Sequence, residues 1–439
     1  MALGGGTYAS MNKAMPGAYH NFISRSAATL GLAARGILAL PMVLSWGKEG
    51  AVIELTAEDM LKNGMKILGY DFTADAMRNI REAFQHANTL YIYRLNGGAA
   101  ATSTYGTAKY KGARGNALKI VITANIEEPT KFDVYTYLDG HQVDLQKAVA
   151  SAAGLVDNDY ISWKKDATLA VTAGVNLTGG EDSAESVNGQ SWQDALTALE
   201  AKSWNVIACA STDDTIKALV FAYVKRLREE VGMPCQAVGY KYTTPDHEAW
   251  ISVENTVTDA GADPASLVYW VAGAAAGFAI NRSMTNYTYT GEYTVDVNYT
   301  QTALSEGIAA GKFMFHDVGG SVNVLKDVNS LVTETPTKGA VFKSNQTIRT
   351  IDELATGTAR IFNQEFLGKV QNNEPGRVSL QARLCSHRKQ LQDMEAIQNF
   401  ADTDLAVSAV EGSHEAVAIA EQVSIVGTMV QLYTTTTIV

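Results

Sequence analysis

Two adjacent carboxylates, Asp213 and Asp214, are the residues whose position best suits chemistry. They follow Trp204–Ala210, an apolar run that predicts a buried strand. Open α/β sheets bind ligands at the carboxyl ends of their strands, so these side chains could form a polar or metal site. They also suit a helix start, where Asp caps N–H groups and complements the dipole. We favour the helix start and keep as the alternative a nucleotide- or metal-dependent α/β enzyme that uses Asp213 and Asp214.

The other motifs that suggest catalysis are incomplete. Gly307–Phe313 looks like a phosphate-binding loop, but it is one residue short and has Phe313 where Ser or Thr must bind Mg²⁺. Cys385 and His387 could form a thiolate–imidazole pair, but residues two apart on a helix point in different directions. The seven histidines and three cysteines show no zinc-site spacing. The sequence therefore predicts no enzyme, no catalytic residue, no metal site and no cofactor.

Composition narrows the class of protein further. The 439 residues exceed the ~250–300 at which a single core stops growing, so several domains are expected. A formal net charge of −11 argues against a general nucleic-acid or anionic-membrane surface. Three widely spaced cysteines fit a reducing compartment, and the N-terminus shows no signal peptide. The run Ala265–Ile280 is shorter than the ~20 residues of a spanning helix, which predicts a buried helix and no membrane insertion.

One stretch reverses the acidic balance of the chain. Residues 375–392 hold four basic side chains and no acid. Such a reversal indicates contact with an acidic surface, and a solvated helix face is the alternative. The four basic residues are Arg377, Arg383, Arg388 and Lys389.

The last stretch, Val423–Val439, is rich in β-branched residues and contains no charge and no proline, which predicts a strand. An unprotected strand of this kind is either buried in its own sheet or pairs with another copy of the chain. The N-terminus offers a similar segment, because a turn at Pro16-Gly17 precedes the apolar anchors Tyr19 and Phe22. A disordered tail is the alternative there.

The residues between these ends alternate helix and strand patterns, which predicts an α/β multidomain chain with open, mixed sheets. Thr56 and Thr350 each precede an acid three residues on and are expected to begin helices with capping boxes. The predicted divisions are an N-terminal arm (1–24), an N-terminal α/β domain (25–97), an inserted β-rich module (98–182), a central α/β domain (183–335), a C-terminal α/β domain (336–422) and a C-terminal strand or arm (423–439).

Taken in order, the chain resembles the contractile tail sheath proteins of phages and phage-tail-like particles. The resemblance covers essentially the whole chain, and its length is similar to the shorter sheaths of Gram-positive prophages and bacteriocins. It departs from the family around Pro41–Gly47, where many members have a Gly-Pro turn. The matching residues are Pro16-Gly-Ala-Tyr19, Tyr91-Ile-Tyr-Arg94, Gly112-Ala-Arg-Gly115-Asn116, Phe366–Asn372 with Gly376-Arg377, and Val430-Gln-Leu-Tyr433-Thr.

The resemblance implies a structural subunit that polymerises as stacked hexameric rings around an inner tube and contracts to drive that tube through a target cell envelope. The implied partners are other copies of the chain, the inner tail tube protein, and baseplate and terminator proteins. The implied location is a virion tail or phage-tail-like particle assembled in the bacterial host cytoplasm. The four basic residues are expected to face the tube. The arms are expected to donate strands between subunits through Pro16, Gly17, Tyr19, Phe22, Met429, Val430, Leu432, Tyr433 and Ile438.

Overall fold

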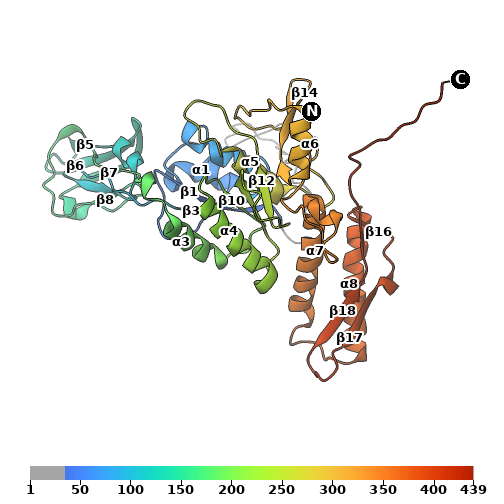
Figure 1. Ribbon diagram of the computed structural model, residues 1–439. Helices are drawn as coiled ribbons and strands as arrows, with labels where there is room; N and C mark the ends of the chain where they lie inside the picture. The colour runs from blue at the N-terminus through green and yellow to red at the C-terminus, as the bar shows by residue number, and fades with distance from the viewer. Residues whose placement is uncertain (1–34, 439) are drawn as a thin grey trace, which may run out of the picture. The chain divides into compact units, whose positions relative to one another are not determined.

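A seven-stranded sheet carries the main core of the chain, which a computed structural model describes from residue 35 to residue 438 (Figure 1). The strand order is β13-β12-β11-β10-β1-β3-β2. Neighbouring strands run parallel except β2, which is antiparallel to β3 at one edge. The prediction of an α/β chain with a mixed sheet is confirmed. The strands are β1 (Ile37–Met42), β2 (Ile53–Thr56), β3 (Thr89–Arg94), β10 (Val206–Cys209), β11 (Gln236–Tyr240), β12 (Trp250–Val253) and β13 (Lys312–Phe313).

Helices cover both faces of this sheet, because its strands are buried along most of their length and successive side chains point to opposite faces. Leu38 and Leu40 of β1 pack in one core with helices α1, α2 and α5. Ala39, which lies between them, packs in a second core with α3 and α4. The five helices are α1 (Ala57–Ile67), α2 (Arg78–Phe84), α3 (Gly189–Glu200), α4 (Asp214–Arg226) and α5 (Leu267–Gly277).

The sheet joins two segments that the sequence analysis places in separate α/β domains, 25–97 and 183–335. β1 pairs on one side with β3 and on the other with β10, so strands from both segments share one sheet. The described part of 25–97 therefore shares one sheet with residues of 183–335. Periodicity locates each strand, but it cannot show that β1 pairs across the intervening segment with β10.

That intervening segment is a β module whose strands pair only with one another among the described residues. They form a four-stranded sheet, β7-β6-β5-β9, and a two-stranded sheet, β4-β8. The two ends of the module lie together, since Ala99 and Glu181 form an antiparallel bridge and Asn96 Nδ2 donates to Asp182 O at 2.7 Å. The strands are β4 (Gly106–Ala108), β5 (Leu118–Ala124), β6 (Phe132–Leu138), β7 (His141–Val149), β8 (Ile161–Trp163) and β9 (Thr172–Asn176).

Trp46 and Arg114 are two of the residues that pack the β module against the region of the main sheet. Trp46, from the loop after β1, is 1% exposed and belongs to the core of the module. Arg114 of the module donates to Gly69 O and forms an ion pair with Asp139 within its own module. The module is therefore packed against residues 46–69 as well as tethered.

The C-terminal region contains two long helices, α7 (Asn345–Ile361) and α8 (Glu374–Asp393), and two short ribbons. The capping box predicted at Thr56 is confirmed, with Asp59 as its partner. The one predicted at Thr350 is wrong, because α7 begins five residues earlier and Thr350 Oγ1 donates to Gln346 O inside the helix. The remaining elements are β14 (Phe315–Val318) with β15 (Ser321–Val324), β16 (Ile397–Gln398) with β19 (Ser424–Ile425), β17 (Leu405–Ala409) with β18 (Val417–Glu421), and helix α6 (Gln301–Ala309).

Helix α5 is buried along almost its whole length, and glycines let it approach α2 closely. A Cβ built on Gly273 would lie 2.4 Å from Ala83 O, and one on Gly277 would lie 1.9 Å from His86 O. No helix among residues 35–438 is both long enough and apolar enough to cross a membrane. The apolar run that the sequence shows is thus the central helix of the core.

Replacing Gly277 with Ala tests this close approach. The added methyl group would collide with backbone that cannot rotate away, so we expect Gly277→Ala to lower the free energy of unfolding by about 1–3 kcal/mol. Gly189→Ala is the matched control, since no atom lies within 4 Å of a Cβ at that position in α3. Urea unfolding followed by circular dichroism measures both. Equal stability of the two variants would contradict the close packing of α5 on α2.

Deleting the β module tests whether the main sheet folds without it. Joining Gly97 to Asp182 should preserve the helical circular dichroism signal, because the ends of the module already meet. The deletion uncovers Trp46, so we expect the deletion variant to be poorly soluble. A Trp46→Ser substitution in that variant should restore its solubility. Loss of the helical signal in both deletion variants would show that the module is part of the common core.

Candidate functional site

Asp213 and Asp214 serve the start of α4. Asp213 Oδ1 accepts a hydrogen bond from Thr215 N at 2.8 Å, which makes Asp213 the N-cap. Asp214 pairs with Lys217, whose Nζ lies 2.6 Å from the carboxylate and also donates to Tyr240 O. Within residues 35–438 no cluster of three or more His, Cys, Asp or Glu side chains could hold a metal ion. The helix-start interpretation of these two acids is therefore confirmed.

The other candidates for chemistry also have structural roles. Lys312 lies in β13 and forms an ion pair with Glu254 at 3.0 Å. Cys385 and His387 do not pair, since His387 Nε2 lies 3.4 Å from Glu353 Oε1. Burial raises the pKa of the Cys385 thiol, which disfavours the thiolate that nucleophilic chemistry needs.

Arg388 is wholly buried and cannot face an inner tube in this structure. It donates to both carboxylate oxygens of Glu421, each at 3.0 Å, and to Thr358 Oγ1 at 2.7 Å. The prediction of a tube-facing side chain is thus wrong for Arg388. The stretch 375–392 contains no acid, but in the folded chain Glu421 of β18, 33 residues after Arg388, lies beside it.

The other three basic residues remain accessible to different degrees. Arg383 is exposed and pairs with Glu365 at 2.9 Å, and exposed Lys389 pairs with Asp402 at 2.8 Å. Half-buried Arg377 donates to the side chain of Asn372. Exposed ion pairs contribute only ~0–1 kcal/mol each, so Arg383 and Lys389 can exchange these partners for others. Contact of these three residues with a tube stays a prediction.

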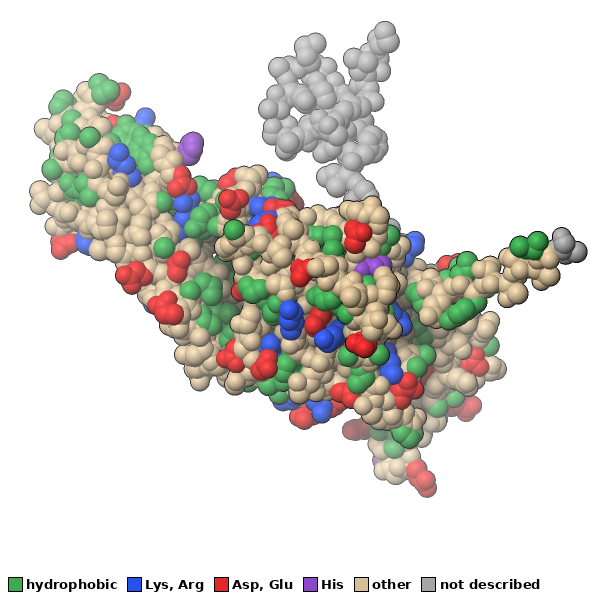
Figure 2. Space-filling model, turned by 45° about the horizontal axis from the view of Figure 1, so that its top comes forward, with side chains coloured by type: hydrophobic (Ala, Val, Ile, Leu, Met, Phe, Trp, Pro, Cys, Tyr) green, Lys and Arg blue, Asp and Glu red, His purple; other side chains and the backbone are tan. Residues whose placement is uncertain are grey.

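The C-terminal segment 426–438 forms no helix or strand, and Figure 1 draws it as an extended trace. The predicted strand over 423–439 is therefore much shorter in a single chain, where only β19 is paired. Residues 429–438 make no hydrogen bond within the described chain. Figure 2 shows hydrophobic side chains along this projecting segment. Met429, Leu432, Tyr433 and Ile438 are each more than 85% exposed, and Val430 is about half exposed.

Strand β18 has one open edge among the described residues. Its ladder with β17 is flanked by bonds from Val410 N to Ala416 O and from Gln422 N to Asp404 O. In an antiparallel ladder every second residue directs its N–H and C=O groups to the partner strand, so the even-numbered residues of β18 face β17. The backbone groups that point to the other edge belong to Val417, Ile419 and Glu421.

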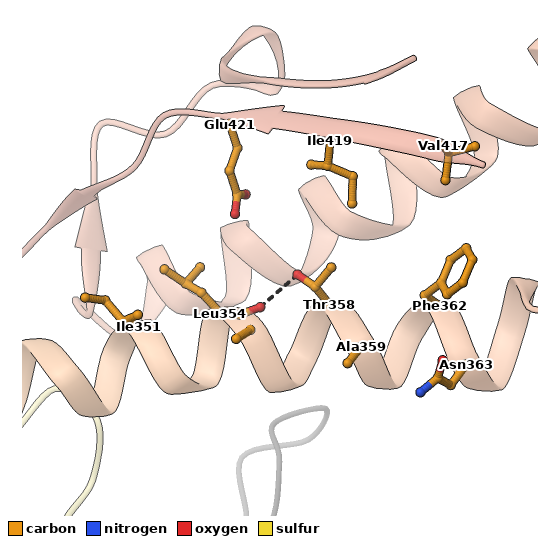
Figure 3. A pocket seen from close by; sticks show the side chains of 10 residues that line it. Ile351, Leu354, Thr358, Ala359, Phe362, Asn363, Val417, Ile419 and Glu421 are labelled. Atoms are coloured by element: carbon orange, nitrogen blue, oxygen red, sulfur yellow. Dashed lines mark hydrogen bonds between the residues drawn. The ribbon is translucent and has the colours of Figure 1, made fainter. Parts of the chain in front are cut away.

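A groove of about 660 Å³ runs between this open edge and α7. Leu354 and Thr358 of α7, and Phe362 directly after it, point toward β18, and Val417 and Ile419 point back toward the helix (Figure 3). The lining is mostly apolar, and its one carboxylate is already held by Arg388. The other lining residues are Ile351, Ala355, Ala359, Asn363 and Glu421.

Sequence reasoning missed both β18 and the groove. The signal for β18 was present, because Ala416–Glu421 alternates small and β-branched residues around Val417 and Ile419. The groove has no local signal, since α7 and β18 meet only in the fold. Pro16, Gly17, Tyr19 and Phe22, predicted for the N-terminal arm, lie outside the described residues.

Four sequence families match successive parts of the chain. Their descriptions are tail sheath protein Gp18 domain III N-terminal region (residues 35–95), phage tail sheath protein beta-sandwich domain (96–182), phage tail sheath protein central domain (185–330) and phage tail sheath C-terminal domain (337–439). The first and third supply the strands of the seven-stranded sheet, and the second coincides with the β module.

Individual relatives match over nearly the whole length. The chain is 31% identical to the phage-like element PBSX protein XkdK of Bacillus subtilis (strain 168), over 93% of this chain and 94% of that protein. It is similar in structure to the sheath tail protein of Desulfitobacterium hafniense, with 37% identity, a TM-score of 0.82 and coverage of 93% and 96% of the two chains. The sheath tail protein Lin1278 of Listeria innocua gives 29% identity, a TM-score of 0.78 and coverage of 91% and 94%. The chain belongs to the phage tail sheath protein family, whose members are structural components of phage tails and tail-like particles.

Proposed function

We propose that this chain polymerises as stacked hexameric rings around an inner tube, and that the polymer contracts to drive the tube through a target envelope. In this proposal the C-terminal segment of one copy adds a strand to β18 of another copy. The observation that carries the proposal is that one subunit contains both an extended apolar segment without partners and an open strand edge above an apolar groove.

The donor segment has the pattern of a strand with one apolar face. Side chains alternate along an extended chain, so Val430, Leu432 and Ile438 lie on the same side. Thr434 and Thr436 complete that side and are β-branched, which favours extended backbone. No Lys or Pro interrupts the segment to discourage pairing.

The acceptor site matches such a strand in length. β18 contains five residues, which corresponds to about 17 Å of strand. The groove follows α7 and the residue after it, from Ile351 to Phe362, which at 1.5 Å per residue is also about 17 Å. A five-residue stretch centred on Leu432 therefore fills the site, with Val430, Leu432 and Thr434 directed into the groove.

The strength of one such link is modest. Each net backbone hydrogen bond contributes ~0.5–1.5 kcal/mol, and burying an apolar side chain such as Leu432 contributes ~1.5–3 kcal/mol. Lost freedom of two whole subunits opposes these gains. A link of this strength favours assemblies in which every copy both donates and accepts, as in a polymer.

The inner surface of the polymer is proposed to contact an acidic tube protein through Arg377, Arg383 and Lys389. These side chains lie on one helix, α8, and two of them are exposed. Baseplate and terminator proteins as partners, and assembly in the host cytoplasm, follow from the family resemblance and belong to the same proposal. The fold offers the enzyme alternative no support at Asp213 and Asp214, which cap and stabilise α4.

The donor side is tested with Leu432→Asp in the full chain. A carboxylate in the groove would lose its water, so we expect the concentration needed for polymer formation to rise at least tenfold. Gln431→Asp adds the same charge on the opposite face and should leave that concentration within about twofold. Sedimentation measures polymer formation, and thermal unfolding should not change in either variant because both residues are exposed. Polymers that form normally from Leu432→Asp would refute the donor role.

The acceptor side is tested with Ile419→Asp, whose side chain points into the groove. Ala418→Asp is the matched control, because Ala418 is the next residue along β18 and points to the other face of the ribbon. The assay measures binding of a fluorescent peptide of residues 429–438 to subunits held below the polymer-forming concentration. We expect Ile419→Asp to prevent this binding and Ala418→Asp to leave it unchanged. Mixing Leu432→Asp with Ile419→Asp subunits should give pairs and no polymers, as analytical ultracentrifugation can show. Peptide binding to Ile419→Asp would place the acceptor elsewhere.

A further inference from the structure

The root of the C-terminal segment is held by the side chain of one buried residue, Gln346. We propose that Gln346 is a positioning residue that fixes where the segment leaves the subunit, and that this fixed exit is required for one copy to reach the next. The inference rests on strand donation by the C-terminal segment. It concerns a residue outside both the donor segment and the groove.

The need for such a residue arises where a short ladder stops. Val426 N donates to Ala396 O at 3.0 Å and so extends the pairing of β16 with β19 by one bond. The reciprocal bond is missing, because Ala396 N donates to Leu391 O at 2.9 Å instead. The carbonyl of Val426 therefore has no partner on β16. The chain would be free to turn at this point.

Gln346 supplies the two bonds that continue the ladder. Its Nε2 donates to Val426 O at 3.2 Å, and its Oε1 accepts from Thr428 N at 3.2 Å and from Thr428 Oγ1 at 3.3 Å. The C=O of one residue and the N–H of the residue two further on point to the same edge of an extended chain. The amide thus pairs with Val426 and Thr428 as a neighbouring strand would.

The residue that would otherwise continue the ladder is already engaged. After the pair of Ala396 with Val426, the next hydrogen-bonded pair of an antiparallel ladder would join Met394 to Thr428. Met394 O instead accepts a hydrogen bond from Asn281 Nδ2 at 2.7 Å. Gln346 occupies the position that Met394 leaves open, so the extended course of the segment continues to Thr428 and the donor residues begin directly after it.

The same helix carries this clamp and the acceptor groove. Gln346 is the second residue of α7, and the groove follows α7 and the residue after it, from Ile351 to Phe362. The position of the donor exit relative to the acceptor groove is therefore set within one rigid element. In a polymer of identical copies, that offset determines the step from each subunit to the next. If the segment left the subunit in many directions, each link between copies would lose more conformational entropy when it formed.

Two substitutions at Gln346 distinguish the effect of its amide hydrogen bonds from the effect of its side-chain volume. Gln346→Ala removes all three bonds to the segment. Gln346→Glu keeps the size of the side chain, but an ionised carboxylate has no donor for Val426 O. Both variants leave the backbone of α7 and the residues that line the groove in place. Gln392→Ala is the matched control, because Gln392 Oε1 accepts from Phe400 N in the same region and the side chain forms no hydrogen bond with described residues 426–438.

The experiment measures three properties of each full-length variant. We expect the polymer-forming concentration to rise about tenfold in Gln346→Ala and Gln346→Glu, while Gln392→Ala stays within about twofold. Hydrogen exchange at the amide of Thr428 should be faster in Gln346→Ala than in the unaltered protein. In Gln392→Ala its rate should not change. Binding of the peptide of residues 429–438 should remain as in the unaltered protein, since the groove is unchanged.

Each outcome decides between a positioning role and a structural one. Polymer formation at the unaltered concentration by Gln346→Ala would overturn the inference, as would an equal loss in Gln392→Ala. Loss of peptide binding in the Gln346 variants would also overturn it, because Gln346 would then support the groove. Failure of the unaltered protein to bind the peptide would instead refute the proposed acceptor site, which distinguishes the two proposals.

Discussion

The ion pair of buried Arg388 with the partly exposed Glu421 is the interaction on which the C-terminal ribbon depends. A two-stranded ribbon is marginally stable in water, and β17 with β18 has no third strand within the described chain. Arg388 binds both oxygens of Glu421 and also reaches Thr358, so it joins α8, β18 and α7. Removing Glu421 would leave the charge of Arg388 buried without its carboxylate partner, which is strongly destabilising. The pair therefore holds β18 above α7 within a single subunit.

The same ion pair removes the one charge that could protect the open edge of β18. Proteins usually blunt an open strand with an outward charge or a proline. In β18 the one charged side chain is Glu421, and Arg388 neutralises it from within the subunit. The edge is thus left apolar and available to a neighbour. Unspecific contact between copies is opposed by the net charge of −11, so the proposed association relies on a segment that fits the groove.

Local sequence patterns predicted individual helices and strands, but they could not predict contacts between residues far apart in the sequence. The capping box at Thr56 and the buried helix around Trp270 depend on residues within one or two helical turns, and both are observed. The pairing of β1 with β10 spans the whole β module, and no periodicity encodes it. The burial of Arg388 depends on an acid 33 residues away, which a window of basic residues cannot reveal. The clamp of Gln346 needs three separate segments to meet.

The bridge between Ala99 and Glu181 also bears on the order in which the chain folds. β3 ends at Arg94 and β10 begins at Val206, so once β3 has paired with β1, placing β10 on the other side of β1 closes a loop of about 112 residues. Once the β module has formed, its joined ends shorten that loop to about 30 residues. The entropy of closure then falls by about 1 kcal/mol, since it grows with the logarithm of loop length. If the β module folds early, its joined ends hold the two parts of the main sheet close together before they pair.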